Sequence, residues 1–466
     1  MFEYPMEDPS KCSDRTKSLI GKFHEHFPQA QIKWVVRAPG RVNILGEHID
    51  YCGYGVLPMA LSRDTMILAT SSHDDNVHLR NTKDQFKPCN FNPNTLDIDK
   101  EEFSWAKYVM CGLYALKTIN PSLKFQGLNI LVDGNIPLSC GLSSSSSLVV
   151  CSALIFCIAH DVKIKKDKFA DICAQVERYI GSAGGGMDQA ISCLAQKGMA
   201  KHIMFNPLRT ENVFLPKSGV IVVANSVSTC DKALTPQYNT RVVECRIGVR
   251  ILTKCLKLDN PELIKIPIDL EEHSKLSKGQ LVELVKQHLK VDGYTQDEIM
   301  KILDINKSKL HGEILTPNTI RVTRFYPRQR LLHVFTETER VDIFVTKCKS
   351  LQQADNSQEV LSHLGLLMNE SHSSCKDLYD CSSPDQDKMV EVMRKNGCHG
   401  ARMTGAGWGG CVVALISAKS ADKFIKDVKQ DYYKDLKVGD LDELIFISEP
   451  EEGAHAYHLE YNSLSN

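Results

Sequence analysis

Five consecutive serines follow a glycine in PLSCGLSSSSS, residues 137–147, and this segment has the composition of an anion-binding turn. Gly141 allows close approach of the backbone, and the apolar run that begins at Leu148 is typical of a helix. N–H groups at a helix start have no partner inside the helix, and the helix dipole is positive there. The segment therefore predicts a phosphate-binding loop, although a polar loop with a serine N-cap is the simpler interpretation of the segment alone.

Four polar side chains lie close together in GRVNILGEHIDY, residues 40–51, beside an apolar strand-like run. They are Arg41, Glu47, His48 and Asp50. Carboxylates accept hydrogen bonds and an imidazole donates or accepts them, so converging side chains of these types can bind a ligand rich in hydroxyls. Each residue taken singly is better explained as a helix cap or a surface salt bridge. The four together favour a binding site.

Three consecutive glycines lie just before Asp188 in ERYIGSAGGGMDQ, residues 177–189. A glycine run costs backbone entropy on folding, so it often marks a close approach or a positive φ. Either Asp188 lies where a ligand contacts the backbone, or the glycines cap one helix and Asp188 caps the next. These two interpretations fit the segment equally well.

A second glycine-rich turn, TGAGWGGC at residues 404–411, precedes a buried-strand pattern. Such turns are common before strands, and the segment carries little information alone. The chain has no GxxxxGK[ST] motif and lacks the HRD and DFG elements, which excludes a P-loop enzyme and a protein kinase.

The elements that must position these motifs follow from the periodicity of apolar residues. Short β-branched runs and helix-period segments alternate through the first half of the chain, which indicates a mixed α/β or α+β domain. A buried-strand run begins at Gly219, so we place a domain boundary between residues 216 and 217. The charged, helix-period segment that follows predicts a helical insertion over about residues 250–325. Strand patterns return at residues 411–416 and 444–447.

Length and composition exclude several classes of protein. A chain of 466 residues is long enough for two domains. Its 56 basic and 57 acidic residues give a net charge of -1, which provides no broad field for nucleic acid or a membrane surface. No segment has the pattern of a signal peptide or the length of a membrane span, so we expect a cytoplasmic protein. The 17 cysteines form no CxxC pair and are expected to be mostly buried thiols rather than disulfides or zinc ligands.

The four segments, in this order, resemble the motifs of the galactokinase branch of the GHMP small-molecule kinases. Within that branch, EHIDYCGYGVLPMA at 47–60 and ERYIGSAGGGMDQ at 177–189 are most similar to N-acetylgalactosamine kinases. The resemblance implies the α+β, two-domain GHMP kinase fold with a helical insertion and an active site in the cleft between the domains. Residues 1–216 are expected to form the N-terminal, ribosomal protein S5 domain 2-like domain, and residues 217–466 the ferredoxin-like C-terminal domain.

The resemblance also implies a reaction and roles for residues. The reaction is ATP-dependent phosphorylation, with Mg²⁺, of the anomeric C1 hydroxyl of N-acetylgalactosamine, galactose or both. Asp188 matches the catalytic base and Arg41 its partner, and an arginine is expected to keep that carboxylate ionised. The sugar-binding positions are Arg41, Glu47, His48, Asp50, Gly185, Asp188 and Tyr238. The ATP-binding positions are Trp105, Gly141, Leu142, Ser143, Ser144, Ser145 and Ser146, and the metal-binding positions are Ser144, Ser145 and Glu177.

Two other functions are compatible with the same motifs. One is a galactokinase with galactose as its main substrate, and the other is a sensor that binds galactose and ATP without efficient turnover. The sensors that resemble this family have a shortened serine motif, whereas GLSSSSS is intact here, which favours an enzyme. The small Gly184 to Gly186 segment could leave room for an N-acetyl group. The expected partners are the sugar and ATP alone, with neither nucleic acid nor membrane, and the chain is expected to be a monomer.

Overall fold

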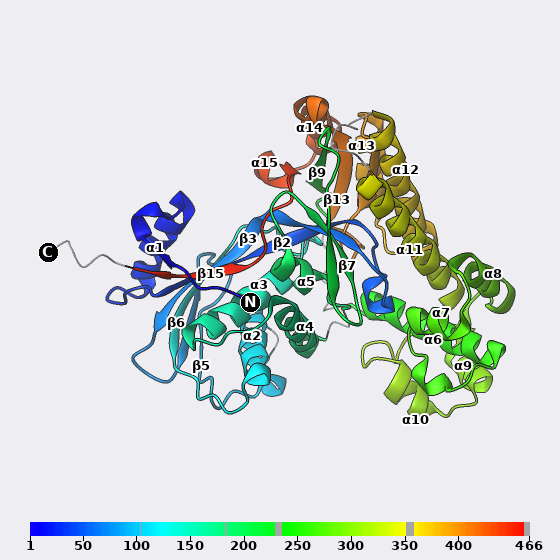
Figure 1. Ribbon diagram of the computed structural model, residues 1–466, viewed down its shortest axis with the longest axis horizontal. Helices are drawn as coiled ribbons and strands as arrows, with labels where there is room; N and C mark the ends of the chain where they lie inside the picture. The colour runs from blue at the N-terminus through cyan, green and yellow to red at the C-terminus, as the bar shows by residue number, and fades with distance from the viewer. Residues whose placement is uncertain (103, 182–183, 229–234, 351–357, 461–466) are drawn as a thin grey trace.

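Two β-sheets carry the fold of the computed structural model, which describes residues 1–102, 104–181, 184–228, 235–350 and 358–460 (Figure 1). The larger sheet has seven strands in the order β1 (Met6–Glu7), β15 (His455–Leu459), β2 (Trp34–Leu45), β3 (Leu57–Ser71), β6 (Leu128–Gly134), β4 (Val77–Asn81) and β5 (Cys89–Phe91). Neighbouring strands are antiparallel except β1 with β15 and β4 with β6. The register of β2 against β3 shifts between Pro39 and Arg41, so a β-bulge precedes the first predicted site residue.

Helices cover both faces of the larger sheet, which explains why β2 is buried along nearly its whole length. One face packs against α2 (Trp105–Ile119), α3 (Ser144–Ala159), α4 (Lys166–Val176) and α5 (Met187–Leu194) (Figure 1). Val36 and Ala38 lie on this face, whereas Val35 packs on the other face with Leu19 and Phe23 of α1 (Asp14–His26). Alternate residues of one strand therefore enter two different cores. The hairpin of β7 (Ala200–Met204) and β8 (Arg209–Val213) follows α5.

The smaller sheet is antiparallel, in the order β12 (Gly400–Met403), β13 (Cys411–Ser417), β9 (Gly219–Asn225) and β14 (Ile445–Ser448). Val222 and Ala224 of β9 pack toward α13 (Pro384–Lys395) and α14 (Ala421–Val428). Ile221 and Val223 point to the opposite face, toward α12 (Gln358–Ser374). Burial on both faces accounts for the unbroken apolar run that marked this strand in the sequence. The short helix α15 (Leu441–Leu444) leads into β14.

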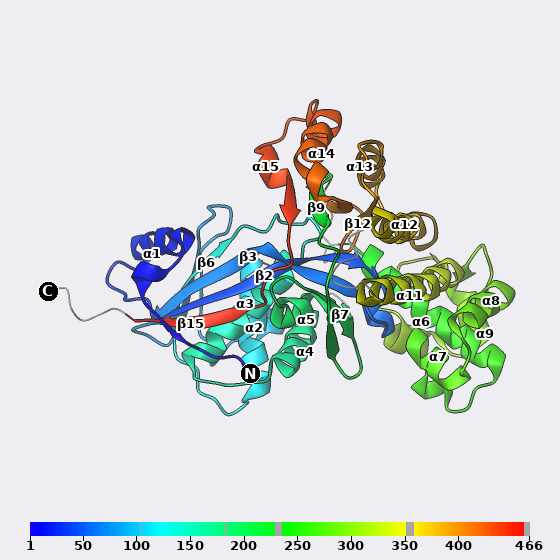
Figure 2. The same ribbon diagram turned by 45° about the horizontal axis from the view of Figure 1, so that its top comes forward.

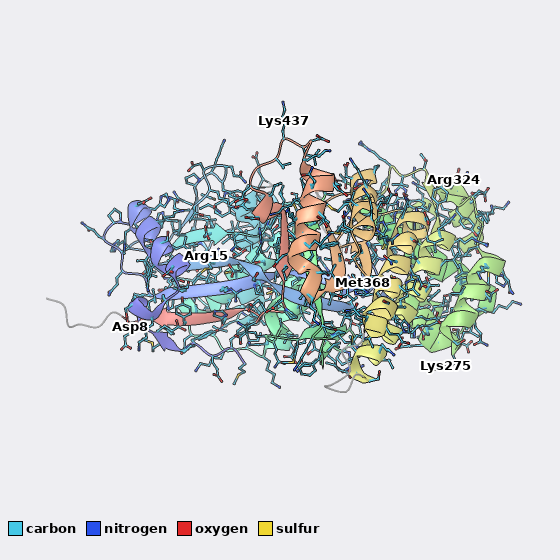
Figure 3. The ribbon with its side chains drawn as sticks, turned by 90° about the horizontal axis from the view of Figure 1, so that it is seen from above. Asp8, Arg15, Lys275, Arg324, Met368 and Lys437 are labelled. Atoms are coloured by element: carbon cyan, nitrogen blue, oxygen red, sulfur yellow. The ribbon has the colours of Figure 1, made fainter. Side chains whose placement is uncertain are left out.

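A helical region lies at the end of the molecule opposite α1, as Figures 2 and 3 show. It contains α6 (Gln237–Leu256), α7 (Pro267–Ser274), α8 (Lys278–His288), α9 (Gln296–Leu303), α10 (Lys307–Lys309) and α11 (Pro327–Ser350), with a small sheet of β10 (Tyr294–Thr295) and β11 (Arg324–Phe325). Four apolar side chains at helical spacing in this region are all buried: Leu281, Leu284, Val285 and Leu289. The helical character predicted for residues 250–325 is confirmed, and its first and last helices, α6 and α11, extend beyond that range.

The α+β class is confirmed, and the C-terminal strand joins the larger sheet. β15 pairs with β2 of the larger sheet, so the segment 217–466 does not lie wholly with the smaller sheet. Closing an exposed sheet edge with the chain terminus removes unpaired backbone groups, and local sequence pattern does not reveal it. The division at residues 216 and 217 stays a prediction. No helix in the described ranges is long and apolar enough to span a bilayer.

Candidate active site

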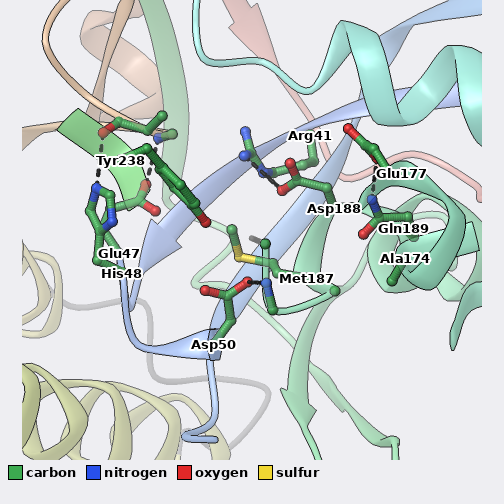
Figure 4. A pocket seen from close by; sticks show the side chains of 15 residues that line it. Arg41, Glu47, His48, Asp50, Ala174, Glu177, Met187, Asp188, Gln189 and Tyr238 are labelled. Carbon is green, nitrogen blue, oxygen red and sulfur yellow. Dashed lines mark hydrogen bonds and ion pairs between the residues drawn. The ribbon is translucent and has the colours of Figure 1, made fainter. Parts of the chain in front are cut away.

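Three adjoining cavities follow one another along the larger sheet and its helices, and two of them also contact the turn at residues 405–409 beside the smaller sheet. The acceptor cavity is lined by Arg41, Glu47, His48, Asp50, Ala174, Glu177, Gly184, Gly185, Gly186, Met187, Asp188, Gln189, Tyr238, Gly405 and Ala406 (Figure 4). The loop cavity shares Arg41, Asp188 and Ala406 with it and is otherwise lined by Tyr108, Ser139, Cys140, Gly141, Leu142, Ser143, Ser144, Ser145, Gly407 and Gly409. The aromatic cavity shares Tyr108, Ser139, Ser144 and Ser145 with the loop cavity and adds Phe86 and Trp105. Residues from all four sequence motifs therefore meet in one place.

Arg41 and Asp188 form a buried ion pair where the acceptor and loop cavities meet (Figure 4). Arg41 Nε donates to Asp188 Oδ1 at 2.8 Å and Nη2 lies 2.7 Å from the same oxygen. Arg41 Nη1 donates to the carbonyl of Gly141 at 2.5 Å, and its backbone N–H donates to the carbonyl of Leu142 at 3.1 Å. Arg41 thus connects strand β2, the first turn of α5 and the serine loop.

The serine run forms the start of helix α3, as the sequence predicted. Ser143 is the N-cap residue in the left-handed region, with φ 59°, and the helix begins at Ser144. Ser147 N donates to the carbonyl of Ser143, so the N–H groups before it have no partner inside the helix. The hydroxyl of Ser143 is buried in the loop cavity without a hydrogen-bond partner among the described residues. An unpaired buried hydroxyl beside free helix N–H groups fits a phosphate ligand.

Ser146 does not reach the loop cavity. Its hydroxyl donates to Glu177 Oε1 at 3.1 Å and accepts from Gln189 Nε2 at 3.3 Å, and its side chain is buried. One residue of a helical turn faces inward while its neighbours face the cavity, so the Ser146 hydroxyl points away from the loop cavity and its contact with ATP stays a prediction. The described contacts give Ser146 a positioning role toward Glu177.

The carboxylate of Glu177 suits a cation. It is buried, it accepts hydrogen bonds from the neutral side chains of Ser146 and Gln189, and no salt bridge pairs it within the described part of the chain. A buried carboxylate without a positive partner is costly unless a cation compensates it. No cluster of three or more His, Cys, Asp or Glu side chains occurs among the described residues. Mg²⁺ commonly uses one or two carboxylates together with phosphate oxygens, so Glu177 with the hydroxyls of Ser144 and Ser145 is a donor set that fits it.

The two glycine-rich turns pack backbone against backbone beside this pair. A Cβ on Gly405 would lie 2.3 Å from the carbonyl oxygen of Gly141, and Gly405 has φ +85°. A Cβ on Gly141 would lie 2.7 Å from the carbonyl oxygen of Thr404. Only glycine permits this approach, which is why both segments are rich in glycine.

Asp50 receives backbone hydrogen bonds from the third glycine-rich segment. Gly185 N donates to Asp50 Oδ2 at 3.2 Å, and a Cβ on Gly185 would lie 2.3 Å from Tyr51 N. The glycine run therefore serves a close approach to Asp50 as well as the start of α5. Burial, followed by the nearby charge of Asp188, raises the pKa of Asp50 to about 6.

His48 and Glu47 line the acceptor cavity but are already bonded within the protein. His48 Nε2 must donate to the carbonyl of Ala406 at 2.9 Å, so Nδ1 accepts from the Tyr51 hydroxyl at 2.8 Å. Burial lowers the pKa of His48 to about 3, which keeps this tautomer neutral. Neither ring nitrogen is left for a sugar hydroxyl, and the expected direct contact of His48 is replaced by a positioning role.

Glu47 is held by three donors from two segments of the chain. Its Oε1 accepts from Gly405 N at 2.7 Å and from Arg402 Nη1 at 3.3 Å, and its Oε2 accepts from Asn43 Nδ2 at 2.9 Å. A carboxylate has about four acceptor positions, so one on Oε2 is left for a ligand. Arg402 is itself fully buried and also donates to Ser371 Oγ.

Tyr238 and Trp105 lie at opposite ends of the three cavities. Tyr238, the second residue of α6, packs against His48 with ring centroids 5.5 Å apart and reaches the acceptor cavity. Trp105, the first residue of α2, packs against Phe86 at 5.5 Å and donates its indole N–H to the carbonyl of Lys87 at 2.9 Å. Together with Tyr108 these rings give the aromatic cavity flat apolar walls.

Sequence reasoning missed several residues that hold the site. Gln189 orients Glu177, and Arg402 and Asn43 orient Glu47. Each lies in or beside a recognised motif: Asn43 and Gln189 are within the segments 40–51 and 177–189, and Arg402 is two residues before the TGAGWGGC turn. A polar residue near a glycine-rich turn was the only sequence feature that could have indicated these positioning roles. Such a residue is usually solvent-exposed, so the feature does not predict a buried contact.

Comparison with known proteins places this site in a family. Residues 21–71 match the galactokinase galactose-binding signature, residues 107–196 the GHMP kinases N terminal domain and residues 357–435 the GHMP kinases C terminal domain. A galactokinase of Dictyostelium discoideum is 35% identical over 92% of this chain and 90% of its own length. The chain belongs to the galactokinase family of GHMP kinases. A galactokinase of Candida parapsilosis is 30% identical, with 98% of this chain and 96% of that protein covered.

Solved structures of GHMP kinases share the fold. Lactococcus lactis galactokinase complexed with galactose has a TM-score of 0.73 at 24% identity and covers 94% of this chain and 98% of its own. Methanococcus jannaschii mevalonate kinase has a TM-score of 0.56 at 19% identity and covers 91% of this chain and 100% of its own. The predicted GHMP kinase fold is confirmed. As a member of this family, the chain is an ATP-dependent phosphotransferase with an alcohol group as acceptor.

We predict that the ionisation of Asp50 makes binding of the acceptor depend on pH. Below pH 6 its carboxyl becomes protonated and loses the charge that strengthens hydrogen bonds from the acceptor's hydroxyls. We expect kcat/KM for the acceptor to fall about tenfold per pH unit below about pH 6. His48, with a pKa of about 3, stays neutral throughout this range and cannot produce the change.

The measurement is the pH profile of kcat/KM for the parent enzyme and for Asp50→Asn. The variant is expected to have a lower kcat/KM at neutral pH and to lack the acidic limb. An unchanged acidic limb in Asp50→Asn would contradict the assignment of that limb to Asp50.

Proposed function

We propose that this chain transfers the γ-phosphoryl group of ATP to the C1 hydroxyl of galactose. The observation that carries the proposal is the Arg41–Asp188 pair, which borders both the acceptor cavity and the loop cavity. A hydroxyl bound in the first cavity and a terminal phosphate bound in the second would meet at this pair. The relatives that match most of the chain are named galactokinase, which favours galactose over the N-acetylgalactosamine expected from the sequence.

Asp188 is the residue that would act on the acceptor. Its carboxylate is bonded through Oδ1 to Arg41 and lines both the acceptor cavity and the loop cavity, where it would accept the proton of a C1 hydroxyl. Phosphoryl transfer requires little covalent chemistry from the protein, so orientation of this hydroxyl accounts for much of what a carboxylate supplies. Proton abstraction and orientation both need an ionised Asp188 at this position.

Arg41 and the start of α3 would bind the transferred phosphate. The guanidinium is anchored to Gly141 and Asp188, so its charge is preorganised where negative charge accumulates in the transition state. The free N–H groups of the first turn of α3 add the positive end of a helix dipole. The aromatic cavity beyond them would hold the adenine between Trp105 and Tyr108. Mg²⁺, when held by Glu177 with Ser144 and Ser145, would neutralise charge on the phosphates.

One observation favours N-acetylgalactosamine as a second candidate acceptor. A Cβ on Gly184, which lines the acceptor cavity, would meet no atom closer than the Tyr238 hydroxyl at 4.0 Å among the described residues. This space could take a small substituent on the sugar.

A cytoplasmic location and a monomeric state also stay predictions.

Replacement of Asp188 by asparagine tests the catalytic assignment. Asparagine keeps the shape of the side chain but cannot take a proton, so we expect kcat to fall by about 10²–10⁴-fold. Galactose binding, measured by calorimetry, is expected to persist. The exposed Asp435 serves as a control, because Asp435→Asn alters the same functional group far from the cavities. Turnover by Asp188→Asn within a few fold of the parent would contradict a direct chemical role.

Comparison of two sugars tests the acceptor. We expect ADP release with Mg-ATP and a kcat/KM for galactose more than tenfold above that for N-acetylgalactosamine, a difference of about 1.4 kcal/mol. Gly184→Val fills the open space and is expected to lower any activity with N-acetylgalactosamine more than activity with galactose. A preference for N-acetylgalactosamine would overturn galactose as the substrate. Binding of sugar and ATP without ADP release would identify a sensor instead.

A further inference from the structure

Cys140 and Cys411 bring two thiols together beside the phosphate-binding loop. Cys411 N donates to the carbonyl of Cys140 at 2.9 Å, and each thiol shifts the pKa of the other, lowering that of Cys140 and raising that of Cys411. A backbone hydrogen bond of this kind holds two Cα atoms at the separation that a disulfide requires, about 4.4–6.8 Å. We propose that Cys140 and Cys411 form a reversible disulfide with a hydroperoxide as the oxidant, and that this bond switches off phosphoryl transfer.

Access distinguishes this pair from the other neighbouring thiols. Burial and the neighbouring Cys245 raise the pKa of Cys52, and Cys381 Sγ donates to the carbonyl of Cys375, but neither pair lines any of the three cavities. Cys140 lines the loop cavity, so the proposal requires a small oxidant to enter through this cavity. The cavity is the one proposed for the phosphates of ATP, so bound nucleotide would shield the thiol.

The chemical environment of Cys140 favours attack on a peroxide. Its thiol donates to the carbonyl of Leu138 at 3.0 Å, and its sulfur accepts a hydrogen bond from Asn225 Nδ2 at 3.1 Å. The neighbouring Cys411 thiol lowers the pKa of Cys140 and so stabilises its thiolate. Burial raises the same pKa, but by less. Burial raises the pKa of Cys52 and of Cys381, which keeps those thiols protonated and less reactive.

The proposed reaction has two steps that balance. The Cys140 thiolate attacks one oxygen of hydrogen peroxide, the O–O bond breaks, and the sulfenic acid forms while the departing hydroxide takes a proton to become water. The Cys411 sulfur then attacks the Cys140 sulfur, and the S–O bond breaks. The departing hydroxide takes the thiol proton of Cys411 and leaves as a second water. Two thiols and one peroxide thus give one disulfide and two waters.

Formation of the bond would displace the residue next to it. The sulfur atoms must close to about 2.05 Å, which pulls on the backbone at Cys140. Gly141, the next residue, holds Arg41 Nη1 through its carbonyl. The neighbouring turn cannot absorb the movement, because a Cβ on Gly410 would already lie 2.6 Å from the Cys140 carbonyl. A displacement of about 1 Å at a reacting group costs on the order of 100-fold in rate, so we expect at least a tenfold loss of kcat.

The test treats the full chain with hydrogen peroxide, blocks remaining thiols with iodoacetamide and maps cross-linked peptides by mass spectrometry. We expect a peptide pair joined through Cys140 and Cys411, at least a tenfold loss of ADP release, and recovery of both states with dithiothreitol. Mg-ATP present during oxidation should slow formation of the cross-link. Activity after oxidation is compared with activity before it within each variant.

Matched variants separate the pair from other cysteines. Cys140→Ser and Cys411→Ser each remove one half of the pair and are expected to abolish both the cross-link and the peroxide sensitivity. Cys255→Ser removes an exposed thiol and should respond to peroxide like the parent. If one pair variant does not fold, the other carries the test.

Two outcomes would overturn the proposal. One is iodoacetamide on both Cys140 and Cys411 after peroxide has removed activity, and the other is an undiminished loss of activity in Cys140→Ser. The activity readout rests on the proposed kinase function, whereas the cross-link does not. Absence of ADP release before oxidation would count against the function alone, and the mass measurement would still decide the disulfide.

Discussion

The buried ion pair of Arg41 and Asp188 is the interaction on which the arrangement of the site depends. A buried charge without its partner is strongly destabilising, so the segments that carry the two residues are constrained to meet. Arg41 lies just after the bulge in β2, and Asp188 is in the first turn of α5. The Gly141 carbonyl accepts a third hydrogen bond from the same guanidinium, which brings the serine loop to the pair. Three distant parts of the chain are thereby fixed around one point.

Backbone packing and a second set of charges join the two sheets at this point. Gly141 and Gly405 approach so closely that neither position has room for a side chain. Arg402, which ends near the Gly405 turn, binds Glu47 beyond the end of β2. Burial alone would raise the pKa of Glu337, but the charges of Arg340, His333 and Arg402 lower this pKa to about 2. The Glu337 carboxylate accepts a hydrogen bond from Gly46 N. The cavities are thus bordered by groups whose positions are set before any ligand binds, which lowers the entropy cost of alignment.

Local pattern predicted the elements well and the partners of individual side chains poorly. The apolar run at β9 was recognised because both faces of that strand are buried, and α3 was expected because its serine run precedes apolar residues. The pairing of Arg41 with Asp188 came only from the family resemblance, since 147 positions separate the two residues in the chain. Ser146 was assigned to ATP although it faces Glu177, because a run of identical residues does not reveal which way each one points. His48 was assigned to the sugar although Ala406 and Tyr51 occupy both of its nitrogens, and these partners come from other segments or from turn geometry. The return of β15 to the larger sheet left no local signal.

The central claim is that the Arg41–Asp188 pair directs phosphate to the C1 hydroxyl of a sugar. The most direct test is NMR of the product formed from Mg-ATP and galactose labelled with ¹³C at C1. The claim predicts a single sugar phosphate whose ³¹P signal couples to the labelled carbon. A phosphate on another carbon, or hydrolysis of ATP without any sugar phosphate, would contradict it.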